Sequence, residues 1–176
     1  MKLRFHWLIT LAGNSLVLFL IQLVNDILAP RTLHIQVDAL FVLFPTLIFP
    51  FVPGLLCVMT TGLVADATHT LHFGTSLILF SVAYTFIYWM RIQFQGYSSR
   101  FTPWLSQIIN AVLFLAISLI LAANHLTSLL YWVSALINLT LSQGVLFILQ
   151  PWFLSLQHSL LKVSKYNFSD SQAHPS

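Results

Sequence analysis

Acids and histidines in the first half of the chain are the residues whose types and spacing could support chemistry. Asp66, His69 and His72 follow one another at three-residue steps. On a continuous helix such steps drift by about 60° against the 3.6-residue period, so the side chains would form a loose arc rather than a tetrahedral site. A loop around an ion, with Asp38 or His34 added, would offer ligands suited to Zn²⁺ or Ni²⁺. The same three residues could instead act as acid and base in a membrane enzyme.

No strong catalytic or metal signature accompanies these residues. The sequence has no H-E-x-x-H, no G-x-S-x-G and no P-loop. Cys57 is the single cysteine, so neither a disulfide framework nor a thiolate metal cluster is available. We therefore expect a protein that is not an enzyme, that holds no metal or cofactor, and whose histidines are solvated.

The composition is that of an integral membrane protein. Hydrophobic residues make up 58% of the chain and charged residues 6%, whereas soluble domains carry roughly 25% charged residues. The net charge is +3, but the cations flank apolar runs and are better read as markers of membrane topology than as a nucleic-acid surface. We therefore expect an all-α membrane protein with the lipid bilayer, and no nucleic acid, as its partner.

Apolar segments of spanning length predict the elements that position the polar residues. Crossing a hydrocarbon core of about 30 Å takes about 20 residues of helix. We predict about six crossing helices in a single bundle, within one transmembrane domain of residues 1–165: 7–29, 38–50, 52–69, 73–93, 103–123 and 127–150. The first follows Lys2 and Arg4 like a signal peptide, but its length and the lack of a cleavage site indicate a retained helix.

The second predicted span is short, carries Pro45, and ends at a cluster of helix breakers. Pro50, Pro53 and Gly54 lie in the segment FPFVPG. Proline removes a backbone donor and clashes with the preceding turn. We expect a tight turn between two short helices here, and the alternative is a single kinked helix over 39–67.

The distribution of basic residues predicts the orientation. With six spans, Arg31 alone lies on one side and six cations lie on the other: Lys2, Arg4, Arg91, Arg100, Lys162 and Lys165. Five spans with the N-terminus outside would give a five-to-two division. The positive-inside rule favours six spans with both termini in the cytoplasm.

The segment after Gln150 permits two interpretations. Residues 151–165 begin with Pro151 and mix apolar residues with His158, Lys162 and Lys165. They could form an amphipathic helix on the cytoplasmic surface or extend the last span. Residues 166–176 are polar, and we predict a disordered cytoplasmic tail.

Asp66 is the most informative acid because it lies near the end of an apolar segment. A carboxylate at the centre of a membrane helix costs about 2.5–3.5 kcal/mol on insertion scales, so such residues usually face the protein interior and have partners. It could mark a binding or coupling site. It could instead cap the next helix, which starts around Gly74, or pair with Arg31.

Other polar residues follow helical spacing. Ser134, Asn138 and Ser142 are four apart in the last span, and Ser106 and Asn110 are four apart in the fifth. Hydrogen bonds between helices are the best explanation for most of them.

A family resemblance rests on a pattern of aspartates and glycines between residues 34 and 87. It comprises Asp38 in QVDALFVL, Gly54 in FVPG, Gly62 and Asp66 in GLVAD, and Gly74 in HFGTS. This stretch resembles the bacterial rod shape-determining protein MreD family, and INLTLSQGVLFILQPWFLSL is similar to that family's final helix. The chain departs from the pattern at Val37, where the family usually has proline, and in the loop ATHTLHFG.

The resemblance implies a non-catalytic scaffold of the cell-wall elongation complex in the bacterial inner membrane. Its partners would be an MreC-like single-pass protein and cell-wall synthesis enzymes. Asp38, Asp66 and Arg31 would belong to a polar rim on the outer face, with Gly54, Gly62 and Gly74 as structural positions. The alternative is a substrate-binding subunit of a vitamin or metal uptake transporter, whose small six-helix fold the MreD family is thought to resemble.

Overall fold

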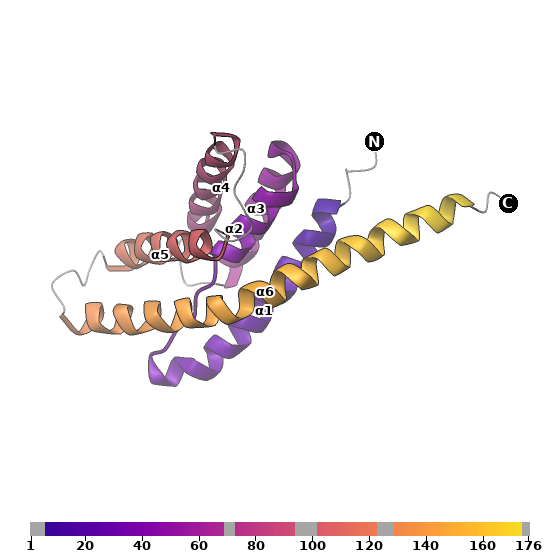
Figure 1. The fold of residues 1–176 in the computed structure, drawn as a ribbon. Coiled ribbons are helices and arrows are strands. Elements are labelled where there is room, and N and C mark those ends of the chain that lie inside the picture. Colours follow the sequence, from indigo (N-terminus) through magenta and orange to yellow (C-terminus); the bar gives the residue numbers. More distant parts are fainter. Residues whose placement is uncertain (1–5, 69–72, 94–101, 123–128, 174–176) are drawn as a thin grey trace.

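The computed structural model describes residues 6–68, 73–93, 102–122 and 129–173, and this part of the chain is helical and contains no strand (Figure 1). The prediction of an all-helical protein is thereby confirmed. The elements are α1 (His6–Leu28), the 3-10 turn η2 (Ala29–Arg31), α2 (Ala39–Ile48), α3 (Phe51–Thr68), α4 (Thr75–Gln93), α5 (Thr102–Leu121) and α6 (Leu129–Ala173).

Three helical stretches are long and apolar enough to cross a membrane. They are Trp7–Arg31, Pro103–Leu121 and Leu129–Leu160. Two further apolar helices are shorter, Ala39–Ile48 and Phe51–Ala67. These lengths and compositions identify a multi-pass membrane protein.

The chain breaks between α2 and α3 where the prolines predicted it. Phe49 closes α2 in an extended conformation, with φ −94° and ψ 154°, and Pro50 separates it from the first residue of α3. Pro53 then lies in the first turn of α3, where the missing backbone donor has no helical acceptor in any case. The prediction of two short helices is confirmed, and the single kinked helix is excluded.

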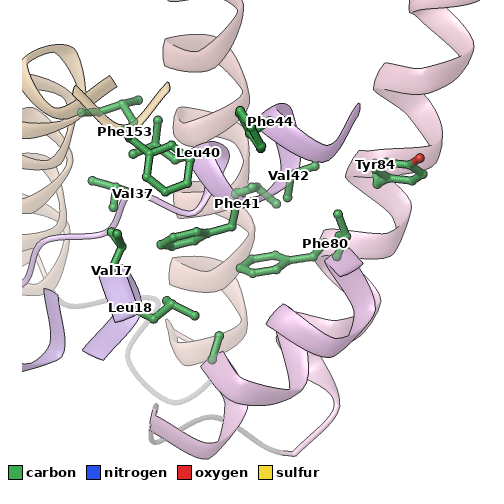
Figure 2. Close-up of a cluster of buried hydrophobic side chains, with 14 of the residues drawn as sticks. Val17, Leu18, Val37, Leu40, Phe41, Val42, Phe44, Phe80, Tyr84 and Phe153 are labelled. Carbon is green, nitrogen blue, oxygen red and sulfur yellow. The ribbon is translucent and has the colours of Figure 1, made fainter. Parts of the chain in front are cut away.

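Helix α2 is the centre of the molecule. It contacts α1, α3, α4, α5 and α6, and its residues from Ala39 to Thr46 are all buried. Figure 2 shows its apolar side chains among those of the surrounding helices. Phe41 and Phe44 both meet the ring of Phe153 of α6 edge to face, at centroid distances of 5.9 and 6.1 Å. Edge-to-face packing of this kind is favoured for aromatic pairs.

Side chains from other helices hydrogen-bond to the backbone at both ends of α2. Asn110 of α5 accepts the backbone N–H of Ala39 at 3.4 Å. At the other end, the guanidinium of Arg91 in α4 donates to the carbonyl of Thr46. A cation at a helix C-terminus interacts favourably with the helix dipole and satisfies a carbonyl left without an intrahelical partner.

Helices α3 and α4 form a hairpin that requires glycine at two crossings. A Cβ on Gly54 would lie 2.3 Å from the hydroxyl oxygen of Tyr84, and a Cβ on Gly62 would lie 2.7 Å from the Cα of Leu77. The Tyr84 hydroxyl donates to the carbonyl of Phe51 at 3.0 Å. Gly54 and Gly62 are therefore the positions that let the two helices approach closely.

Helix α6 is longer than the sequence predicted. It runs without interruption for 45 residues and contains Pro151 in its interior, which corresponds to about 68 Å at 1.5 Å per residue. Of the two alternatives for 151–165, the extension of the last span is the one observed. The helix also continues through residues 166–173, where we had predicted disorder.

The helix ends are distributed to two sides of the molecule (Figure 1). Helix α1 begins and α6 ends on one side, at the upper right of the view. The end of α1, the end of α5 and the start of α6 lie together on the other side. We call this second side the α1-end face.

Candidate functional site

The chain between η2 and α2 is not helical, although its last three residues are buried. Thr32 takes a left-handed conformation with φ 57°, and residues 33–37 adopt no regular secondary structure. Gln36, Val37 and Asp38 are buried. We call residues 32–38 the α1–α2 linker. Its backbone groups need partners, because an unpaired backbone group away from water costs several kcal/mol in a membrane.

Asn25 of α1 supplies the first of these partners. Its side chain accepts the N–H of Ile35 at 2.8 Å and donates to the carbonyl of the same residue at 2.9 Å. An amide side chain can pair in this way with both backbone groups of one residue, as a neighbouring strand would. Asn25 thus fixes the linker against the last turn of α1.

Helices α5 and α6 clamp the linker from the other side. Asn138 accepts the N–H of His34 at 3.2 Å, and the hydroxyl of Ser142 accepts the N–H of Gln36 at 3.0 Å. Asn110 donates to the carbonyl of Gln36 at 3.0 Å. The polar residues at four-residue spacing therefore do hydrogen-bond across helices, but their acceptors and donors are mostly the linker backbone.

Asp38 lies at the start of α2, as the resemblance implied, but it does not cap the helix. Its side chain makes no capping bond and instead accepts from the Nε2 of Gln36. It is 3% exposed. The capping bond comes from Asn110, so Asp38 is a buried carboxylate held by one amide at the centre of the bundle.

Asp66 caps α4, which is one of the two structural roles predicted for it. One carboxylate oxygen accepts the N–H of Gly74 at 2.9 Å and that of Leu77 at 3.3 Å, and the other accepts the N–H of Ser76 at 2.8 Å. Gly74 has φ +98°, a conformation that favours glycine. The predicted alternative pair with Arg31 is not observed among the described contacts of Asp66, and Arg31 is exposed.

The candidate ligand set of Asp66, His69 and His72 cannot be assembled from the described residues. His69 and His72 lie outside them, and in the parts of the chain that the structure describes no group of three His, Cys, Asp or Glu residues could hold a metal ion.

A polar cavity of about 370 Å³ opens between α1, the linker, α5 and α6 at the α1-end face. Its polar lining comes from four segments of the chain: Gln22, Asn25, Asp26, His34, Gln36, Ser118, Tyr131, Ser134 and Asn138. Apolar residues complete it: Ala29, Phe114, Ile117, Leu121 and Ala135. Its volume lies within the range of about 300–1,000 Å³ that is typical of small-molecule sites.

Hydrogen bonds hold the cavity wall in place. The Nε2 of Gln22 donates to Asp26 at 2.9 Å one turn further along α1. The hydroxyl of Tyr131 donates to the carbonyl of Ser118 at 2.7 Å and so joins α6 to α5. Asp26 is the single carboxylic acid among the described lining residues, which include no lysine or arginine.

A second polar cluster lies between α1, α3 and α6. The Nε2 of Gln157 donates to Asn14 at 3.0 Å, and the Nδ2 of Asn14 donates to the hydroxyl of Thr61 at 3.2 Å. A Cβ on Gly13 would lie 2.7 Å from the Gln157 amide. This cluster ties the part of α6 that follows Pro151 to α1 and α3.

The sequence revealed only part of the cavity. From the sequence, His34 is a possible metal ligand, and Ser134 and Asn138 are expected to pack between helices. Gln22 and Asn25 were not assigned to any site. Their three-residue spacing, with Asp26 one position further, places all three on one face of α1 and is the signal that could have found them.

The chain matches no protein-family model, no curated protein and no solved structure.

Proposed function

We propose that the protein is a non-catalytic scaffold of the bacterial cell-wall elongation complex, located in the inner membrane, where it binds an MreC-like single-pass protein. The supporting observation is the role of the residues that carry the resemblance. Asp66 and Gly74 form the cap of α4, Gly54 and Gly62 allow α3 and α4 to approach, and Asp38 begins the central helix. In these roles the residues set how the helices are arranged, and none of the roles involves a reacting substrate.

The proposal includes six membrane crossings. Helix α2 has ten residues, or about 15 Å of helix, which is half of a hydrocarbon core of about 30 Å. The seven-residue linker adds at most about 25 Å. The linker and α2 together are long enough for the second crossing. Side chains of α1, α5 and α6 hydrogen-bond to the linker backbone, which lowers the cost of placing it within the membrane. Both termini then lie in the cytoplasm, beside the larger group of cations.

The partner would bind at two places. Its transmembrane helix would pack against the exposed apolar side of the bundle, and its juxtamembrane segment would contact the α1-end face, where Asp26 and Arg31 are exposed. Wall-synthesis enzymes would join through this partner.

Affinity purification of the tagged protein from its own membranes in mild detergent, followed by mass spectrometry, tests the proposal. We expect recovery of a single-pass protein with a coiled coil and an outer domain, together with wall-synthesis enzymes. Asp66→Asn and Asp38→Asn should weaken that recovery and alter cell shape, whereas Gly144→Ala, which meets no neighbouring atom, serves as the control. Unchanged recovery and shape in both aspartate variants would refute the scaffold role of this region.

The polar cavity favours one second candidate, the substrate-binding subunit of an uptake transporter. A cavity of about 370 Å³ at one face is what such a subunit needs to hold a small molecule. Recovery of paired ATPase subunits in the same purification would favour this function over the scaffold.

A further inference from the structure

We propose that the cavity at the α1-end face is a binding site for the protonated amine of a small polar molecule, with Asp26 as the counter-charge. The inference rests on the cavity itself and on neither proposed function. A scaffold could use such a site to sense a metabolite or hold a lipid, and an uptake subunit could use it to carry cargo.

The lining of the cavity carries polar side chains beside a larger apolar surface, which suits a molecule with a polar group on an apolar skeleton. Nine of its residues offer polar side chains, which include four amides, two hydroxyls of serine, a phenol, an imidazole and a carboxylate. A cavity that were merely a packing defect would be lined by apolar groups, because buried polar groups without partners are costly. Several of these groups already bond the linker, so the wall is fixed before any ligand enters.

Charge selects the class of ligand. Asp26 contributes a negative charge to the wall, and no lysine or arginine is among the described lining residues. Gln36 forms part of the wall and donates to the carboxylate of Asp38 behind it. One carboxylate in a partly enclosed space, with no lysine or arginine in the described lining, favours a cation over an anion.

The remaining groups favour an organic amine over a bare metal ion. Asp26 has one other described partner, the amide of Gln22 at 2.9 Å, so the carboxylate can accept a further donor. A divalent ion would require several oxygen ligands converging at 2.0–2.6 Å, and no second carboxylate lines the cavity in the described residues. The apolar wall from Phe114, Ile117 and Leu121 would contact the carbon skeleton of the amine.

An amine of this kind could come from water or from the bilayer. A soluble amine would enter at the α1-end face, whereas the ethanolamine headgroup of a phospholipid would enter from the membrane interface. The two sources share the same ammonium chemistry and are separated by the experiment.

The experiment measures thermal unfolding of the purified full chain in detergent. Two amines are compared with alcohols of the same shape, ethanolamine with ethylene glycol and tyramine with tyrosol, and 4-hydroxyphenylacetate serves as the anion. We expect a saturable rise in Tm with an amine and none with its alcohol or with the anion, because only a ligand that binds the folded state raises Tm. In the lipid arm, nanodiscs with phosphatidylethanolamine are compared with nanodiscs of phosphatidylglycerol.

Three variants locate the site. Asp26→Asn should weaken amine binding at least tenfold, and Ser134→Phe should abolish it by filling the cavity. Leu136→Phe is the matched control, because Leu136 is 66% exposed, lies on the same helix and does not line the cavity. Stabilisation by the lipid alone, lost in Asp26→Asn, assigns the headgroup as the source.

A rise in Tm that survives both Asp26→Asn and Ser134→Phe would place the binding elsewhere and overturn the inference. Equal responses to amine and alcohol, or no response to either amine or to the lipid, would overturn it as well. The amine response is measured on the purified chain alone, so a failure of the amine site is distinguishable from a failure to copurify the proposed protein partner.

Discussion

Asp66 shows how a carboxylate is accommodated at the end of an apolar helix. It is 4% exposed, and burial without partners would be unfavourable for its charge. Three N–H groups at the start of α4 bond to it, and the positive end of the helix dipole lies at the same place. The capping role was one of two structural roles predicted from sequence, because a polar residue that precedes a glycine and a new apolar run is typical of a cap.

Replacing Asp66 should therefore affect stability through α4. Asp66→Ala removes every acceptor, and we expect a loss of about 1–2 kcal/mol in the free energy of unfolding. Asp66→Asn keeps one oxygen acceptor and should lose less than half of that. Chemical unfolding of the purified protein in mixed micelles measures both. Equal stability of the wild type and Asp66→Ala would contradict the capping role.

Packing of α3 against α4 depends on a single hydrogen atom at Gly62. A Cβ there would lie 2.7 Å from the backbone Cα of Leu77, and backbone cannot move aside as the end of a long side chain can. The family resemblance implied a structural role for Gly62. The sequence could not predict which glycine lies against the backbone of the neighbouring helix, because that depends on the crossing point of the two helices.

Gly62→Ala should separate the hairpin and lower the free energy of unfolding by about 1–3 kcal/mol. Gly144→Ala on α6 is the matched control. A Cβ at Gly144 meets nothing within 4 Å, so alanine should be neutral or should stabilise the helix by about 0.5–1 kcal/mol. Thermal unfolding of the two variants side by side checks the difference, and a neutral Gly62→Ala would exclude the close approach.

At the scale of elements, the α1–α2 linker and α2 form one unit that is held by its surroundings. The linker has no regular secondary structure of its own, and its partners lie on α1, α5 and α6. The sequence predicts a span at 38–50, but it does not predict the clamped backbone that precedes this span. The bonds to α5 and α6 join residues more than seventy positions apart, and no local pattern encodes them.

Removing a clamp should loosen the linker without unfolding the bundle. Asn138→Leu deletes the acceptor of His34 and the donor to Thr32, and we expect at least tenfold faster amide exchange over residues 32–36. The control is Thr140→Leu, since the Thr140 hydroxyl bonds only within its own helix, to the carbonyl of Leu136, among the described contacts. Hydrogen exchange with mass spectrometry compares the two. Unchanged exchange in Asn138→Leu would show that the linker is held by other contacts.

The length of α6 illustrates where helix-breaking signals fail. Pro151 suggested a boundary, but it removes only one backbone donor within a helix. Beyond it, Phe153 packs on α2 and Gln157 bonds to α1, and both are fully buried. Tertiary contacts on the far side of the proline therefore keep the helix continuous.

At the scale of the whole molecule, the number of crossings decides which face meets which compartment. Cysteines introduced one at a time by Arg31→Cys, Ser98→Cys and Ser171→Cys can be labelled with a membrane-impermeant maleimide in intact cells and in lysed cells. Native Cys57 is buried and supplies the unlabelled background. With six crossings, Arg31→Cys should label in intact cells and the other two only after lysis. Five crossings would place Arg31→Cys with the other two.

The cavity belongs to this scale as well, and the sequence could not predict it. Composition established the membrane class, and proline and glycine positions located the break between α2 and α3. The cavity arises only where the last turn of α1 meets the facing ends of α5 and α6. Residues from these helices lie about a hundred positions apart, and their convergence depends on how the helices tilt and cross.

The clamped linker has a consequence for how the protein is made. The backbone N–H of Gln36 donates to the hydroxyl of Ser142, a residue that is synthesised 106 positions later. At a synthesis rate of about 5–20 residues per second, the ribosome needs about 5–20 s to deliver that partner. During this interval the N–H of Gln36 lacks its acceptor, so the nascent linker must be sheltered from lipid by the insertion machinery or remain at the aqueous surface until the last helices emerge.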